Sequence, residues 1–118
     1  MADIEMTAAY ASVVEDEGML FVGFAEGEAE DEGYALFRQA LEGGPVWFEV
    51  TDEAFGAEGA LEKVVAGPGG LEITLKPGMA AKFGWAGSVA IRIGVGVEGR
   101  TAAFEALAGM LGAVWMEG

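Results

Sequence analysis

Apolar and polar residues alternate along much of this chain, which is the pattern of β-strands that bury one face. The clearest run is 71–76, where three apolar residues alternate with three polar ones. A Gly-Pro-Gly-Gly link joins it to the apolar run 60–66, so these two runs predict a hairpin. The same pattern predicts further strands at residues 7–14, 19–25, 46–51 and 88–95.

Three of these runs also indicate which residues face the core. Val46, Phe48 and Val50 share one face of the strand at 46–51. The strand at 88–95 is expected to turn four residues inward: Val89, Ile91, Ile93 and Val95. The run 19–25 is apolar at consecutive positions, which predicts a central strand that is covered on both faces.

Residues 34–42 fit both a helix and a strand. Tyr34, Phe37 and Leu41 have helical spacing, and the alanine, leucine, arginine and glutamine residues here favour a helix. Alternation works as well, with every second residue from Tyr34 to Ala40 on one side of a strand. Propensity alone favours the helix, and a Gly-Gly-Pro link ends the element in either case.

Two further segments predict less regular structure. Residues 51–59 read as a polar loop that carries one aromatic residue, Phe55. Residues 77–84 predict one or two helical turns that stop at Gly84.

The last segment of the chain carries the clearest helical pattern. Five large apolar residues recur there at helical spacing, with Thr101 as the candidate N-cap: Phe104, Leu107, Leu111, Val114 and Trp115. Strands joined by short links and followed by a helix are typical of an α+β domain. We therefore expect a single domain over residues 1–118, built as a mostly antiparallel curved β-sheet with the C-terminal α-helix packed on one face.

The charge of the chain is concentrated in its first half. The 118 residues include 20 acidic and six basic side chains and no histidine, a net charge of −14. Residues 1–59 hold 15 of the acidic side chains and one arginine, whereas residues 60–118 hold five of each sign. Such a field repels phosphate backbones and anionic membranes and attracts basic partners. We therefore expect no nucleic-acid or membrane partner, although an acidic run is more often a solvated loop.

The sequence also bears on location. No lysine or arginine precedes Arg38, so the basic start of a signal peptide is missing. The longest uncharged apolar run, at 106–116, is too short to span a bilayer. A cytoplasmic protein is expected.

Little in the composition points to an enzyme. Without cysteine or histidine the chain has no disulfides, thiolate nucleophiles or Ser-His triads, and most zinc sites are excluded. Glu49 lies close in sequence to Asp52 and Glu53, but acid-rich loops make such carboxylate pairs common. The acidic run 26–32 lacks the ligand spacing of a calcium loop. We expect no catalytic activity, no metal and no cofactor.

Residues 94–99 read Gly-Val-Gly-Val-Glu-Gly, a literal G-x-G-x-x-G between a strand pattern and a helix pattern. A dinucleotide site also needs a second strand after the helix and an acidic residue at its end. We expect no second strand here, which leaves Glu117 without a strand to hold it. The glycines are therefore interpreted as a turn or bulge rather than as a phosphate loop.

An aromatic residue beside acidic side chains can anchor a protein partner. Trp47, Phe55 and Trp85 are candidates for this role, although such residues more often fold back onto their own domain. The candidate partner-binding residues are Glu26, Glu28, Glu30, Asp31, Glu32, Trp47, Asp52, Glu53 and Phe55.

Several stretches along residues 6–115 carry a resemblance to a known family. They are YALFRQALE, VWFEVTDEAFGAEGALEKV, LEITLKPGMAAKFGW, the IRI strand and a closing Phe-x-x-Leu-x-x-x-Leu helix. Together they resemble the immunity protein 10 family of bacterial polymorphic-toxin systems. Tyr34 and Arg38 match its Tyr-x-x-x-x-Arg-like strand with a one-residue offset. Residues 46–49 stand at its aromatic YYxE strand, and residues 59–64 at its Gly-Gly before an IxKV strand.

The resemblance implies a non-enzymatic antitoxin that binds and blocks a toxin domain, and a strand rather than a helix over 34–41. Thr51, Asp52 and Glu53 stand where the family has Asp-Gln and Asn, so it implies a member that diverges at these polar positions. The implied partner is a cognate toxin, and a basic nuclease domain fits the acidic half of the chain. A homodimeric structural or regulatory module and a module that binds or hydrolyses a small ligand stay open as alternatives.

Overall fold

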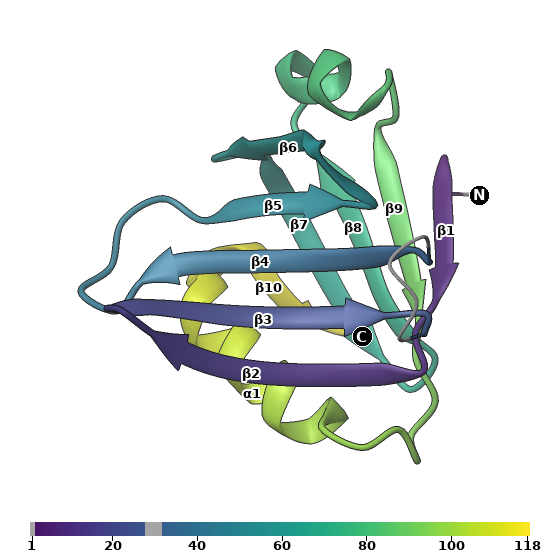
Figure 1. Ribbon diagram of the computed structural model, residues 1–118. Helices are drawn as coiled ribbons and strands as arrows, with labels where there is room; N and C mark the ends of the chain where they lie inside the picture. Colours follow the sequence, from purple (N-terminus) through teal and green to yellow (C-terminus); the bar gives the residue numbers. More distant parts are fainter. Residues whose placement is uncertain (1, 28–31) are drawn as a thin grey trace.

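Two five-stranded β-sheets pack face to face, and their strands cross at a steep angle (Figure 1). The computed structural model describes residues 2–27 and 32–118, and of Glu53 only the backbone. Sheet A has the strand order β1-β9-β8-β7-β10, and sheet B has the order β2-β3-β4-β5-β6. Sheet B is therefore a meander, in which strands that follow one another in the chain are neighbours.

The strands of sheet A are shortest at its two edges. They are β1 (Ile4–Thr7), β9 (Ser88–Arg92), β8 (Gly70–Leu75), β7 (Leu61–Gly67) and β10 (Trp115–Glu117). The strands of sheet B are β2 (Tyr10–Asp16), β3 (Met19–Ala25), β4 (Tyr34–Ala40), β5 (Trp47–Val50) and β6 (Asp52–Glu58). The pairs β1–β9 and β7–β10 are parallel, and all the other pairs are antiparallel.

The chain passes between the sheets at two corners. At the first, the amide of Ala8 donates to the carbonyl of Arg92 in sheet A, and the amide of Ala9 donates to Ala25 in sheet B. At the second, Gly59 donates to the carbonyl of Val46 in sheet B and adopts a left-handed φ of 66°, and β7 of sheet A starts two residues later. The strand expected at 7–14 is therefore split between the two sheets.

A chain of aromatic rings runs through the core between the sheets. It begins at Phe83, crosses β5, β4 and β3 at Phe48, Phe37 and Phe24, and ends at Phe104 and Trp115. Successive ring centroids lie 5.8, 4.7, 6.2, 6.5 and 5.8 Å apart. Each buried phenylalanine contributes about 1.5–3 kcal/mol of hydrophobic stabilisation before the cost in conformational entropy. These rings make the two sheets one core.

Two helical elements close the sides of the sandwich. Helix α1 (Arg100–Leu111) packs against the edge strands β2 and β10 and buries Ala103, Leu107 and Met110. Its N-cap Gly99 has a φ of 86°, and a Cβ there would lie 2.2 Å from the carbonyl oxygen of Ala11 in β2. The 3₁₀ helix η1 (Pro77–Phe83) packs beside β6 on the other side. No helix among the described residues is long and apolar enough to cross a membrane.

The expected α+β class, with mostly antiparallel sheet and a C-terminal helix, is confirmed. The helical turns at 77–84 are confirmed as well, and they end at Gly84 in a left-handed conformation. The helical interpretation of 34–42 is wrong, because Tyr34–Ala40 form β4. Burial of Ala35 and Phe37 between β3 and β5 outweighs the helical propensity of these residues.

Other sequence expectations need correction. Residues 51–59 are not a polar loop, because most of them form the edge strand β6. The C-terminal helix ends at Leu111, so Val114 and Trp115 lie beyond it. Gly99 takes the N-cap position expected for Thr101. Val95 does not face the core: its side chain is exposed in the turn after β9.

Candidate protein-binding surface

The charge asymmetry between the two halves of the chain becomes an asymmetry between the two sheets. Residues 10–58, which form sheet B, contain 13 acidic side chains and a single cation, Arg38. The remaining residues contain seven acidic and five basic side chains. Nearly the whole net charge of the protein therefore belongs to sheet B and its connections.

The outer face of sheet B is apolar at its centre, although it points away from the core. In Figure 1 it faces the viewer, and no element formed by residues 2–27 and 32–118 lies over it. Six large side chains alternate onto this face from β2, β3, β4 and β5, and we call this set the aromatic face: Tyr10, Val14, Phe21, Tyr34, Leu36 and Trp47. Tyr10 and Val14 are each 50% exposed, and the other four are partly exposed.

The indole ring of Trp47 is positioned by one residue from each of the two adjacent strands. The guanidinium carbon of Arg38 on β4 is 4.7 Å from the centre of the indole ring. Gly56 on β6 lies beneath the ring, where an added Cβ would be only 2.6 Å from an indole carbon. Glycine at this position is what allows the indole to cover the sheet edge.

Among the described residues, Glu49 is the one acidic residue that is buried. Its carboxyl group connects two side chains of the aromatic face. Its side chain is 5% exposed although it points to the outer side of the sheet. The indole Nε1–H of Trp47 donates to one carboxyl oxygen at 2.7 Å, and the hydroxyl of Tyr34 donates to the other. The carboxyl group thus fixes the two aromatic side chains in place from adjacent strands.

Acidic residues gather at both ends of the aromatic face. At one end lie the β2–β3 turn and the end of β4, which carry Glu15, Asp16, Glu17 and Glu42. At the other end lie the β3–β4 connection and the β5–β6 turn, with Glu26, Glu32 and Asp52. The surface therefore has an apolar centre and anionic ends.

Two of these acidic groups also organise the backbone. The carboxylate of Glu26 accepts hydrogen bonds from the amides of Thr7, at 3.2 Å, and Gly33, at 3.1 Å. Asp52 accepts from the amide of Ala54 at 2.8 Å and so shapes the turn into β6. Their negative charges are held at fixed positions rather than on free side chains.

The structure brings together only part of the predicted partner-binding set. Trp47 lies on the aromatic face, and Glu26, Glu32 and Asp52 lie at one end of it. Glu28, Glu30 and Asp31, together with the side chain of Glu53, lie outside the described residues. Sequence reasoning left Tyr10, Phe21 and Leu36 out of the set, although the two-sided apolar pattern of 19–25 was a usable signal.

Phe55 does not join this surface. It lies on the opposite face of β6, where it contacts the end of η1 near Gly84. Trp85 follows there with a φ of 70° and an exposed fraction of 80%. The two residues form a separate apolar spot at the η1 end of the sandwich.

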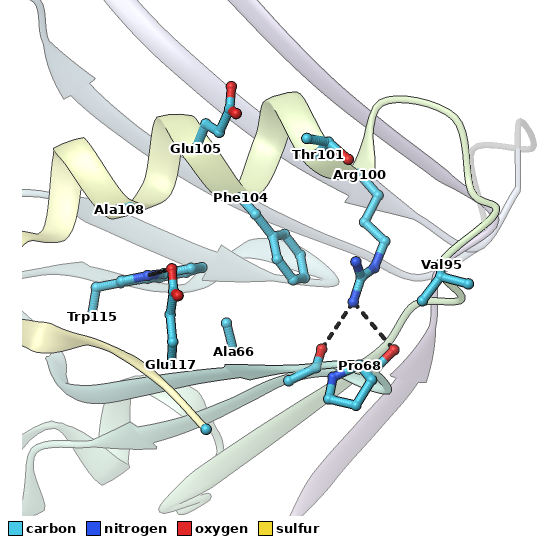
Figure 2. Close-up of a pocket in the computed structure, with 12 residues that line it drawn as sticks. Ala66, Pro68, Val95, Arg100, Thr101, Phe104, Glu105, Ala108, Trp115 and Glu117 are labelled. Carbon is cyan, nitrogen blue, oxygen red and sulfur yellow. Dashed lines mark hydrogen bonds between the residues drawn. The ribbon is translucent and has the colours of Figure 1, made fainter.

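A groove lies on the side of the molecule that carries α1 (Figure 2). It has a volume of about 500 Å³ and lies between α1, β10 and the β7–β8 turn. Phe104 and Trp115 form its apolar wall, and Glu105 and Glu117 are acidic residues on its lining. The guanidinium of Arg100 stacks on Phe104 and donates to the carbonyls of Gly67 and Pro68 at 2.9 and 3.2 Å.

The glycine motif at 94–99 lies at the mouth of this groove. The expectation that no strand follows the helix is wrong, because β10 is parallel to β7 and holds Glu117. The third glycine, Gly99, is nevertheless explained by its close approach to β2. Arg100 is the cation nearest the motif, and its guanidinium group donates hydrogen bonds to backbone carbonyls of the β7–β8 turn.

The acidic side chains described on sheet B lie apart from one another and from the hollows of its outer face. Within the described part of the chain, no three acidic side chains are grouped to hold a metal ion. A hollow of about 160 Å³ on the aromatic face is lined by residues of β2, β3 and β4, and neither Glu49 nor Asp52 lines it.

Comparisons of the chain with protein-family models, with curated proteins and with solved structures find no match.

Proposed function

We propose that this chain is a non-enzymatic immunity protein that binds a cognate toxin domain in the cytoplasm and blocks it. The observation that carries the proposal is the aromatic face, a contiguous apolar surface with acidic ends. Exposed apolar patches of this kind mark interaction sites on monomeric proteins. An apolar centre with a charged border is also the composition of protein–protein interfaces.

The partner that fits this surface has an apolar spot surrounded by lysine and arginine. Acidic groups at both ends of the face would meet that basic border, and the long-range field of sheet B would speed the encounter. A nuclease toxin carries lysine and arginine where it binds phosphates, so an acidic protein seated there would exclude the nucleic acid.

The resemblance to the immunity protein 10 family supports the same proposal. It implied a strand over residues 34–41, and β4 occupies Tyr34–Ala40. Two β4 residues carry the resemblance. Tyr34 belongs to the aromatic face, and Arg38 lies on the same outer side of sheet B. Residues 46–49, which carry it on the next strand, include Trp47 and Glu49.

Growth rescue tests the proposal. Each candidate toxin domain encoded beside this gene is expressed in a bacterial host, alone and together with this chain. We expect the wild type to restore growth and to bind the purified domain with an affinity that falls as salt rises. Leu36→Lys places a cation in the centre of the aromatic face and should abolish both effects. Val65→Lys makes the matched change on the outer face of sheet A and should leave them intact.

Three results would contradict the proposal. They are an unchanged rescue with Leu36→Lys, an equal loss with Val65→Lys, and an affinity that does not depend on salt. Both positions lie on the outer surfaces of their sheets, so we expect both variants to keep the fold. Unfolding curves measured for each variant test this.

A second function, binding of a small ligand, is favoured by the groove beside α1. Its volume falls in the range of about 300–1,000 Å³ that small-molecule sites occupy. Ala108→Phe would fill this groove from the helix side. Rescue that survives the substitution shows that toxin binding does not use the groove and leaves the groove as a separate small-ligand site, whereas rescue that is lost places toxin binding at the groove.

A further inference from the structure

The aromatic face contains a slot whose floor is formed by two residues without large side chains. Gly23 and Ala25 follow each other on the outer side of β3. Tyr10 and Ser12 stand beside them on β2, and Tyr34 and Leu36 on β4. We call this hollow of about 160 Å³ the tyrosine slot.

The register places the two tyrosines on opposite walls of the slot. Tyr10 and Tyr34 are both paired with Ala25, one from each neighbouring strand. Because adjacent strands lie about 4.8 Å apart, the two tyrosine backbones are separated by about 9.6 Å. That separation admits one inserted side chain with an aromatic ring on each side. The hollow is well below the size of a typical small-molecule site.

The electrostatics of the slot favour a cation. The hydroxyl of Tyr34 donates to the carboxyl group of Glu49, which enriches the electron density of the ring. The carboxylate of Glu26, the residue after Ala25, is held by the amides of Thr7 and Gly33 at this end of sheet B, where its charge adds to the long-range negative field. Arg38, the one cation of residues 10–58, lies away from the slot and stacks on Trp47.

We propose that the tyrosine slot takes a single lysine or arginine side chain of the protein partner. The inference rests on the proposed function, because it names the chemistry of the partner group that seats on the aromatic face. An inserted cation would contact the faces of Tyr10 and Tyr34, and its apolar stem would lie along Gly23 and Leu36. The Arg38–Trp47 stack shows the same kind of contact already present on this face.

Titration with synthetic peptides tests this inference without the toxin. Hexalysine and hexa-arginine are the probes, and hexa-acetyllysine is the uncharged control. We expect the two cationic peptides to shift the backbone amide resonances of Gly23 and Ala25 and to bind measurably at low salt. The acetylated peptide should do neither.

Filling the slot provides the decisive variant. A Cβ at Gly23 would meet its nearest atom, Ser12 Oγ, at 3.4 Å, an ordinary van der Waals contact, and the two methyl groups that Gly23→Val adds to it would occupy the slot. We expect the Kd for hexalysine to rise about 2- to 30-fold, the change for loss of one cation–π contact. Tyr10→Ala should do the same, whereas Tyr10→Phe keeps the ring and should bind like the wild type. The matched control is Gly67→Val on β7, where the nearest atom is 3.9 Å away.

The outcomes separate this inference from the proposed function. Cationic peptides that bind Gly23→Val and Tyr10→Ala as tightly as the wild type would overturn the slot, while growth rescue would still stand or fall on Leu36→Lys. Equal binding of hexa-acetyllysine would overturn the assignment of a cation. Loss of growth rescue in Gly23→Val, with the fold intact by its unfolding curve, would support the slot directly.

Discussion

The two sheets have similar inner faces and very different outer ones. Inside, both contribute apolar side chains to a common core. The outer face of sheet A carries charges of both signs, including Glu72 and Lys63, and an ion pair of 2.9 Å between Arg92 and Glu5. The outer face of sheet B carries the aromatic face with the buried Glu49 at its centre, and most of the exposed acidic residues of this sheet lie at the ends.

This difference indicates which features serve folding and which serve binding. Sheet A has a largely polar outer face, and its inner side chains are still buried in the common core. Sheet B departs from that solution with Tyr10 and Val14 half exposed to solvent. Because burial in the core does not account for these side chains on the outside, their exposure supports the proposed contact with another molecule.

The largest expected effect is the difference in unfolding free energy between substitutions on the two faces of sheet B. Phe48 is fully buried on the inner side of β5, at the centre of the aromatic chain, so Phe48→Ala should lower the free energy of unfolding by about 3–5 kcal/mol. Tyr10→Ala on the outer side should change it by less than about 1 kcal/mol. Urea unfolding of both variants measures the contrast. A loss for Tyr10→Ala as large as that for Phe48→Ala would mean that the aromatic face belongs to the core.

Glu49 gives a smaller effect, because it stabilises only the aromatic face. Glu49→Ala leaves the indole N–H of Trp47 and the hydroxyl of Tyr34 without their acceptor, at an expected cost of about 1–3 kcal/mol in unfolding free energy. Glu49→Gln keeps one acceptor oxygen and should cost less. Tryptophan fluorescence and urea unfolding measure the two variants. Equal stability of Glu49→Ala and the wild type would show that the carboxyl group does not hold the face in place.

The inner faces of the sheets could be predicted from the sequence, because burial imposes a period of two. Leu71, Ile73 and Leu75 alternate in the sequence and are all buried in β8. The division into two sheets could not be predicted in the same way. The break at Ala8 and Ala9 consists of backbone hydrogen bonds to two different sheets, and neither residue carries a local turn signal.

Two interpretations of the sequence prevented the aromatic face from being predicted. The consecutive apolar residues of 19–25 predicted a strand covered on both sides, but only the inner side is covered. The helical propensity of 34–42 concealed the alternation that places Tyr34, Leu36 and Arg38 together. Once β4 is a strand, its register with β5 brings Tyr34 next to Glu49, a contact 15 residues apart in the chain.

The smallest expected effect is the response of stability to salt, and it should differ between the sheets. Salt screens the attraction between Arg92 and Glu5 in sheet A, an exposed pair that contributes less than about 1 kcal/mol. The same salt screens the mutual repulsion of the 13 acidic side chains of sheet B and its connections. Since repulsion is the larger contribution at a net charge of −14, the Tm of the wild type should rise as salt is added.

Calorimetry at low and high salt should find a steeper rise for Arg92→Ala and a shallower one for Glu15→Gln combined with Asp16→Asn. A Tm that falls with salt in the wild type would show that the acidic residues of sheet B do not repel one another appreciably, and the long-range field that is expected to attract a basic partner would be correspondingly weak.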